Sequence, residues 1–228
     1  IISFLFSYFK PSLLFLDTTT TGGDMPGHNV LAHYLKTDLL PNGKLIGWFP
    51  YSLSGFPLFQ YYFFLPYLLA VLLSYIMPFN IAFKLSTVLG IFLLPIAIFI
   101  STKLIGFKFP APAIASVFSL LFLFKEEGFA AGGTIKSALA GQFTFTLSLV
   151  FLFVALGVIY RGIERQNDRR YFIISILAIS LIVFSHIFSM IPLLLICTFF
   201  VIEALIKKKF DNILYLAKVF GLAFLLFG

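Results

Sequence analysis

Charged residues are scarce in this chain. Only 11% of its 228 residues are Asp, Glu, Lys or Arg, whereas 61% are hydrophobic, and the mean hydropathy is +1.06. A soluble domain carries roughly 25% charged residues. The chain therefore lacks the polar side chains needed to cover a water-exposed surface, which predicts an integral membrane protein.

Cysteine and the common catalytic motifs are also nearly absent. The single cysteine, Cys197, lies in an apolar segment and is interpreted as a small buried hydrophobe. One cysteine supports neither a disulfide nor a cysteine-based metal site. The sequence has no zinc-ligand spacing, P-loop, dinucleotide fingerprint or nucleophile elbow.

The net charge of +7 does not indicate a nucleic-acid partner, because the excess lies in short loops between apolar runs. The chain starts in an apolar run without Met and stops in another, so we expect a fragment of a longer protein. No signal peptide is recognisable, because the sequence has neither a basic N-terminal segment nor a small-residue cleavage site.

Long hydrophobic runs fill most of the sequence. They are continuous rather than alternating, which favours membrane helices over a barrel. The fold class predicted is all-α, a polytopic transmembrane helical bundle forming one membrane domain over residues 1–228. The expected apolar segments are 62–79, 82–102, 110–124, 143–160, 171–185, 187–206 and 212–228.

The main polar stretch is Asp17–His28, which is rich in threonine and glycine and contains two carboxylates. Asp24 followed by Pro26 predicts a helix start. Over 25–36 the pattern places Val30 and its apolar neighbours on one face and His28 with other polar residues on the opposite face. This predicts an amphipathic helix lying in the membrane surface.

An aromatic, proline-punctuated stretch follows, containing Trp48 and Tyr51, and is typical of a membrane interface. The segment 62–79 is short and flanked by prolines, so we interpret it as not crossing the membrane. Residues 17–80 then form a first external loop with interfacial and non-spanning helices.

Two loops are strongly basic and are expected in the cytoplasm. One contains four arginines within 161–170, and the other is Lys207–Lys209. Counting spans back from them places 125–142 outside. If 62–79 does not cross, Asp24 lies outside as well; if it crosses, Asp24 is cytoplasmic.

Asp24 and His28 are the first candidate site. Their four-residue spacing places them on one face of the first helical turn, where a carboxylate and an imidazole can share a proton, activate a hydroxyl or hold a metal. The alternative is a capping aspartate beside a surface histidine.

The second candidate is the loop around 125–142. Glu126 and Glu127 offer carboxylates, and Lys136 and Thr134 next to glycine-rich backbone suit a phosphate. The alternative is an ordinary connecting loop. A third candidate is His186, which is either functional or a hydrogen-bonded interfacial histidine.

Several motifs resemble a known family. Thr21-Gly-Gly-Asp-Met-Pro-Gly-His28, Leu40–Pro50, Gly55–Tyr62 and Gly132–Phe143 are similar to prokaryotic membrane proteins labelled "6-pyruvoyl-tetrahydropterin synthase-related". No pterin chemistry is visible here. That family resembles the GT-C superfamily of membrane glycosyltransferases, which use polyprenyl-phosphate sugars.

The GT-C resemblance implies an essential acid in the first external loop, at Asp24, with His28 orienting it. It also implies that 62–79 belongs to that loop, that Glu126 or Glu127 assists, and that Lys136 pairs with the leaving phosphate. A divalent metal held by Asp24 and Glu127 is the expected cofactor, if there is one. Where relatives are expected to have Glu, this chain has Gln142.

The chain is expected to be a multi-pass cell-membrane protein. Its expected function is to transfer a sugar from a polyprenyl-phosphate donor on the outer face of the membrane. The partners expected are the bilayer and the lipid-linked sugar, with Thr134, Lys136 and His186 as substrate contacts. The alternatives are a transporter or lipid flippase, or a non-catalytic membrane assembly protein.

Overall fold

The computed structural model describes residues 1–60, 63–127, 132–165 and 168–227. It is mostly helical, with one short β-hairpin among the described residues. Three helices are long and apolar enough to cross a membrane: Phe79–Ile105, Ile135–Glu164 and Ile187–Ile206. The expectation of a helical membrane protein is confirmed at this level.

The chain divides into two compact units. Unit 1 comprises Ile1–Phe92 and Leu123–Leu147, and unit 2 comprises Leu93–Phe122 and Ser148–Gly228. Two long helices contribute to both units, so the division does not follow the order of the sequence.

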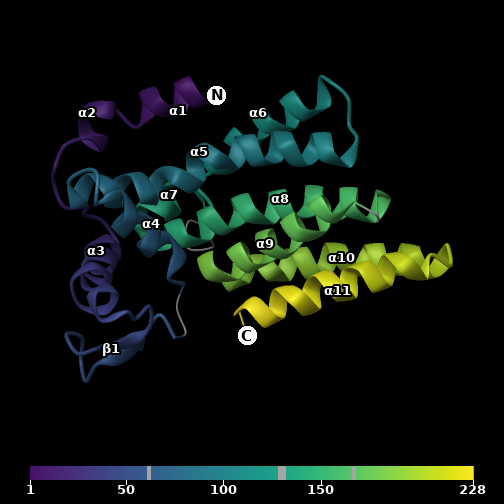
Figure 1. The fold of residues 1–228 in the computed structure, drawn as a ribbon. Coiled ribbons are helices and arrows are strands. Elements are labelled where there is room, and N and C mark those ends of the chain that lie inside the picture. Colours follow the sequence, from purple (N-terminus) through teal and green to yellow (C-terminus); the bar gives the residue numbers. More distant parts are fainter. Residues whose placement is uncertain (61–62, 128–131, 166–167, 228) are drawn as a thin grey trace. The chain divides into compact units, whose positions relative to one another are not determined.

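Unit 1 contains the short elements of the first half of the chain (Figure 1). They are α1 (Ile2–Tyr8), α2 (Pro11–Leu14), α3 (Met25–Tyr34), η1 (Leu35–Leu39), η2 (Leu40–Asn42), β1 (Gly47–Phe49), β2 (Phe56–Leu58), α4 (Leu65–Leu73) and the first part of α5 (Phe79–Ile105), followed after a loop by α7 (Ile135–Ser137), η4 (Ala138–Gln142) and the start of α8 (Phe143–Glu164).

The antiparallel hairpin pairs Gly47 with Leu58 and Phe49 with Phe56. It is tied to α3 because the Tyr34 hydroxyl donates a hydrogen bond to the carbonyl of Trp48, at 2.8 Å. Trp48 and Tyr51 remain exposed, as interfacial aromatic residues would be.

The predicted segment 62–79 contains the short helix α4, and its failure to cross the membrane stays a prediction. Nine residues rise only about 13 Å in an α-helix, whereas the hydrocarbon core of a bilayer is about 30 Å thick. Its Pro66 lies in the first turn, where the missing N–H costs little.

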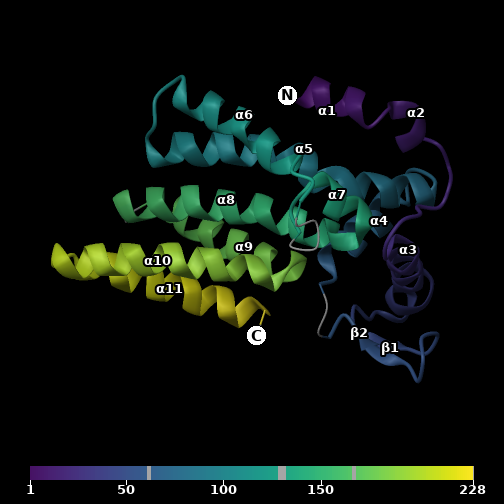
Figure 2. The same cartoon turned by 180° about the vertical axis from the view of Figure 1, so that it is seen from behind.

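Unit 2 contains the remainder of α5 and α8 together with the helices of the second half of the chain. These are α6 (Ala111–Leu123), α9 (Arg169–Ser185), η5 (Ile187–Ser189), α10 (Met190–Ile206) and α11 (Phe210–Phe227). Helix α11 packs against both α9 and α10, and both ribbon views show α10 and α11 side by side (Figures 1 and 2).

Small and hydroxyl residues allow close helix packing in unit 2, as is common in membranes. A side chain at Gly157 would collide with the backbone of Ser101 on α5. The buried hydroxyls of Ser148 and Ser189 hydrogen-bond to each other at 2.5 Å.

The predicted segments 82–102, 143–160 and 187–206 correspond to the three candidate spans. The segment 110–124 is a shorter apolar helix of 13 residues, α6. Helix α10 exposes Leu195 and Phe199 at 60% and 69%. Such exposure of large apolar side chains suits contact with lipid tails.

Candidate active site where two polar segments meet

The backbone of the Gly22-Gly23-Asp24 turn contacts the π-helical segment η4. The Asp24 N–H donates a hydrogen bond to the Ala140 carbonyl, at 2.9 Å. Gly23 has φ +50, and a Cβ placed there would lie 2.2 Å from the same carbonyl oxygen. Only glycine permits this approach, so the sequence Gly-Gly-Asp places Asp24 against η4.

Asp24 occupies the N-cap position of α3, as predicted, but its side chain makes no capping hydrogen bond. Its backbone angles, φ −87 and ψ 4, are not the extended angles from which a capping aspartate reaches the next turn. The carboxylate is solvent-exposed and accepts no hydrogen bond within the described part of the chain. Asp24 therefore occupies the position of a capping residue, but its side chain does not cap the helix.

His28 follows one turn later and is buried, with 9% of its surface exposed. Its Nδ1 lies 2.7 Å from the hydroxyl of Tyr67, on α4. The imidazole also contacts the ring of Phe143 edge-on at a centroid distance of 5.5 Å. Burial lowers the pKa of His28, and the nearby Asp24 carboxylate partly opposes this shift. At neutral pH the ring is therefore uncharged.

Gly141 completes the contact between the two segments. It has φ +124, and a Cβ there would lie 3.0 Å from the Asp24 Cβ and 3.0 Å from His28 Nε2. Because Tyr67 engages Nδ1, Nε2 is the nitrogen that faces Gly141. Asp24, His28 and the backbone of η4 thus form one compact group.

The predicted faces of α3 are wrong for His28 and Val30. The buried residues are Met25, His28 and Ala32, whereas Val30 is 51% exposed. Polarity alone assigned His28 to the solvent face, but the hydroxyl of Tyr67 gives it a hydrogen-bond partner inside unit 1. A buried polar group is tolerated when it is paired in this way.

An apolar cavity of about 220 Å³ adjoins this group. Its lining includes Met25 and Leu139, the chain neighbours of Asp24 and Ala140. Thr20 also lines it, and its hydroxyl is buried with no hydrogen-bond partner among the described residues. Lys84 also lines the cavity, and its ammonium donates hydrogen bonds to the carbonyls of Leu13 and Leu16.

Glu126 and Glu127 are exposed. Within the described residues no hydrogen bond or ion pair links either of them to Asp24 or His28. Nor do the described residues contain a group of three or more His, Cys, Asp or Glu side chains placed to hold a metal. Metal binding by Asp24 and Glu127 stays a prediction.

The remaining candidates in unit 1 differ in exposure. Lys136 is exposed on α7. Thr134 is 3% exposed, and its hydroxyl caps α7 by accepting a hydrogen bond from the Ser137 N–H at 3.2 Å. This structural use is enough to explain Thr134. Gln142 ends η4 and is exposed.

His186 lies in unit 2, at the turn between α9 and η5. The Phe188 N–H donates a hydrogen bond to its Nδ1, at 3.4 Å. Burial lowers the pKa of His186 to about 4. Its predicted contact with substrate is not tested by this geometry.

Two members of the site, Tyr67 and Gly141, were not predicted as functional residues. Tyr67 sits in an apolar run with no polar neighbour to signal its role. Gly141 belongs to one of the motifs quoted above, but nothing in the sequence indicates that it contacts Asp24.

The fold and this polar group describe a helical membrane protein with a buried histidine and an exposed carboxylate at one junction. A family model described as "6-pyruvoyl-tetrahydropterin synthase related domain", a membrane protein, matches residues 59–228. The match covers more than half of the chain, so the chain belongs to this family. No curated protein and no solved structure matches the chain.

The family resemblance is therefore confirmed, whereas the resemblance to GT-C enzymes stays a prediction. The matched region includes Tyr67, Gly141 and Gln142 but begins after Asp24 and His28.

Proposed function

We propose that the chain is part of a membrane glycosyltransferase that takes its sugar from a polyprenyl-phosphate donor on the outer face of the membrane. The observation that carries the proposal is Asp24, which is fixed through its backbone while its carboxylate accepts no hydrogen bond from the residues that the structure describes. The resemblance of this loop to the acid-bearing first loop of GT-C enzymes motivates the reaction class.

In this reaction Asp24 acts as general base. Its carboxylate accepts the proton of the acceptor hydroxyl as the oxygen attacks the anomeric carbon. The bond from that carbon to the phosphate oxygen breaks, and the polyprenyl phosphate leaves with the bonding electrons. A positioned base of this kind contributes roughly 10²–10⁴-fold to the rate.

His28 acts as a positioning residue. Tyr67 and Phe143 fix its ring, and burial lowers its pKa, so the ring is uncharged at neutral pH. The apolar cavity next to Met25 offers room for part of a lipid chain. Lys136, exposed on α7, is the candidate cation for the departing phosphate.

The test is sugar transfer by the full-length protein reconstituted in lipid vesicles. Radiolabelled polyprenyl-phosphate hexoses are supplied, and the label that leaves the lipid phase is measured. We expect Asp24→Asn to lower transfer by roughly 10²-fold or more, because the amide keeps the shape but cannot accept the proton.

Asp38→Asn is the matched control, because Asp38 is an exposed aspartate of the same loop, and its carboxylate accepts a hydrogen bond from the neighbouring Thr37 hydroxyl. Its transfer rate should equal that of the unmodified protein. Full activity in Asp24→Asn would remove Asp24 from the mechanism.

A further inference from the structure

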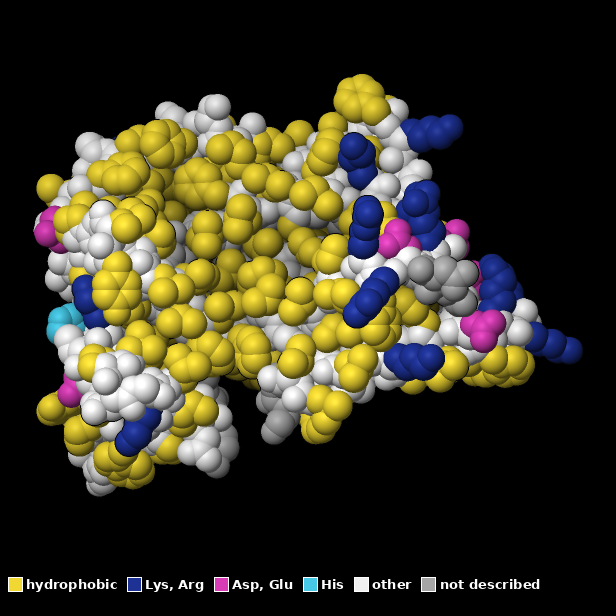
Figure 3. Space-filling view, viewed as in Figure 1, with side chains coloured by type: hydrophobic (Ala, Val, Ile, Leu, Met, Phe, Trp, Pro, Cys, Tyr) yellow, Lys and Arg dark blue, Asp and Glu magenta, His cyan; other side chains and the backbone are white. Residues whose placement is uncertain are grey.

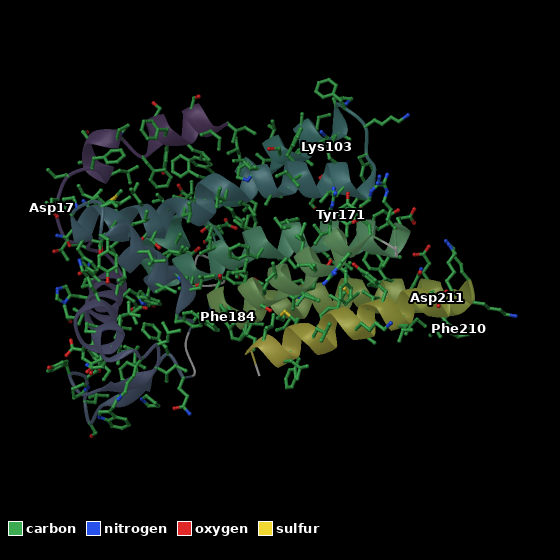
Figure 4. The ribbon with its side chains drawn as sticks, in the orientation of Figure 1. Asp17, Lys103, Tyr171, Phe184, Phe210 and Asp211 are labelled. Atoms are coloured by element: carbon green, nitrogen blue, oxygen red, sulfur yellow. The ribbon has the colours of Figure 1, made fainter. Side chains whose placement is uncertain are left out.

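A large open cavity lies at one end of unit 2, where two helix-to-helix turns face each other. Its volume is about 1240 Å³. One side is formed by the end of α8 and the start of α9, and the other by the turn from α10 into α11 (Figure 4, right). Its lining includes five cationic residues: Arg165, Arg169, Arg170, Lys208 and Lys209.

Among the described residues, no ion pair joins these cations to a carboxylate. The one ion pair in the described part of the chain joins Lys207 to Glu203, and neither residue lines the cavity. Three acids also line the cavity: Glu164, Asp168 and Asp211. Asp168 caps α9 by accepting a hydrogen bond from the Arg170 N–H at 3.0 Å. Asp211 lies in the first turn of α11, where the helix dipole favours a negative charge.

Basic loops at this end of the helices are expected from topology alone (Figure 3, right). Membrane topology explains why basic residues lie in these loops. It does not explain why they surround a cavity. The backbone adds a second argument at Lys208, which has φ +53.

Lys208 occupies the left-handed position of a helix-ending turn. The Lys209 N–H donates to the Ala204 carbonyl at 2.8 Å and the Lys208 N–H to the Leu205 carbonyl at 3.2 Å, which is the pattern of a Schellman motif. Glycine is the usual residue at this position because it adopts positive φ without strain. Here the residue is a lysine, whose side chain makes this backbone conformation strained.

Apolar residues adjoin the cationic lining. Phe210 lines the cavity and is 63% exposed, and Ile206 is 78% exposed at the end of α10. A ligand that satisfies both features carries negative charge at one end and hydrocarbon at the other.

We propose that this cavity binds the phosphate headgroup of an anionic membrane lipid, with the acyl chains lying along α10 and α11. Basic pockets between membrane helices on the cytoplasmic side are suited to such headgroups. The cavity is much larger than a free phosphate needs, and the adjoining Phe210 gives a lipid an advantage over a soluble anion.

The test uses the full-length protein, purified in a neutral detergent and stripped of lipid. Native mass spectrometry measures its affinity for dioleoylphosphatidylglycerol, dioleoylphosphatidylcholine and inorganic phosphate. Each removed cation should weaken phosphatidylglycerol binding roughly fivefold, so the double variant Lys208→Gly with Arg169→Gln should lose about 25-fold. Lys208→Gly also relaxes the strained turn, so this position is safe for folding.

The control variant combines Lys103→Gln and Lys108→Gln, which removes two charges of unit 2 outside the cavity lining. Its affinity for phosphatidylglycerol should change less than twofold. Equal losses in the two double variants would mean diffuse charge attraction and would overturn the proposal. Binding of inorganic phosphate as tightly as phosphatidylglycerol would assign the cavity to a soluble anion instead.

Discussion

Asp24 is held by its backbone while its side chain remains available. Most exposed aspartates at helix starts use their carboxylate to satisfy the first N–H groups of the helix. Here the Asp24 N–H donates a hydrogen bond to the Ala140 carbonyl, and the carboxylate makes no capping hydrogen bond. Fixing a reactive group through its main chain places it without consuming its hydrogen-bonding capacity.

Gly141 gives the first prediction at the residue scale. Gly141→Ala should destabilise the protein for two reasons. An alanine is strained at φ +124, and its Cβ would lie only 3.0 Å from the Asp24 Cβ and from His28 Nε2. Backbone strain of this kind costs about 1–3 kcal/mol. The melting temperature in detergent and the rate of sugar transfer should both fall.

Gly106→Ala separates strain from clash. Gly106 has a similar φ of +111, but nothing lies within 4 Å of its would-be Cβ. We expect a moderate loss of stability and unchanged transfer. Equal behaviour of the two variants would show that Gly141 does not support the site.

At this scale the sequence indicates Asp24 and His28 because a polar cluster in an apolar chain is conspicuous, and the structure places both residues against η4. Their surroundings were less predictable. Tyr67 lies far along the chain in a hydrophobic run, and its pairing with His28 depends on tertiary structure. Polarity alone could not reveal that a histidine is buried against a tyrosine.

At the scale of elements, α3 is anchored to α4 through His28 and Tyr67. This contact should make stability depend on pH. Because burial lowers the pKa of His28 in the folded state, the unfolded chain binds a proton below about pH 6.5 while the folded chain does not. Stability is unaffected above that pH and falls as the pH drops below it.

The expected result is a melting temperature that decreases between about pH 7.5 and pH 5.5. His28→Gln should reduce this decrease, since glutamine can still pair with Tyr67 but does not titrate. His33→Gln, on the exposed side of the same helix, is the control and should retain the full decrease. A His28→Gln profile identical to that of the parent protein would contradict the assignment.

Element positions were largely predictable from hydropathy, and three of the predicted segments are long enough to cross a membrane. The faces of α3 were not fully predictable, because α3 packs against α4 and η4, and a polar residue on that side can be buried and paired. The π-helical segment η4, with its glycine at positive φ, also has no clear signature in the sequence.

For the whole molecule, the arrangement in the membrane gives a further prediction. We expect the α5–α6 loop in the cytoplasm from the distribution of basic residues. The first loop is expected outside because 62–79 is interpreted as not crossing the membrane. In a Cys197→Ser background, Asp38→Cys should react with a membrane-impermeant maleimide in right-side-out vesicles, whereas Lys108→Cys should react only after permeabilisation.

Both probes are exposed positions, so lack of reaction reports the side of the membrane rather than burial. Labelling of both from the same side would contradict the topology. It would also remove the basis for placing sugar transfer on the outer face.

The hydrogen bond between Asp24 and Ala140 has a consequence for biogenesis. The ribosome synthesises the first loop well before η4, which anchors it, because α4, α5 and α6 lie between the two in the sequence. Contacts between distant parts of a chain form late, because the intervening chain must first be ordered. The carboxylate can therefore reach its place only after η4 has been synthesised, so a nascent chain interrupted before Ala140 would have no assembled site.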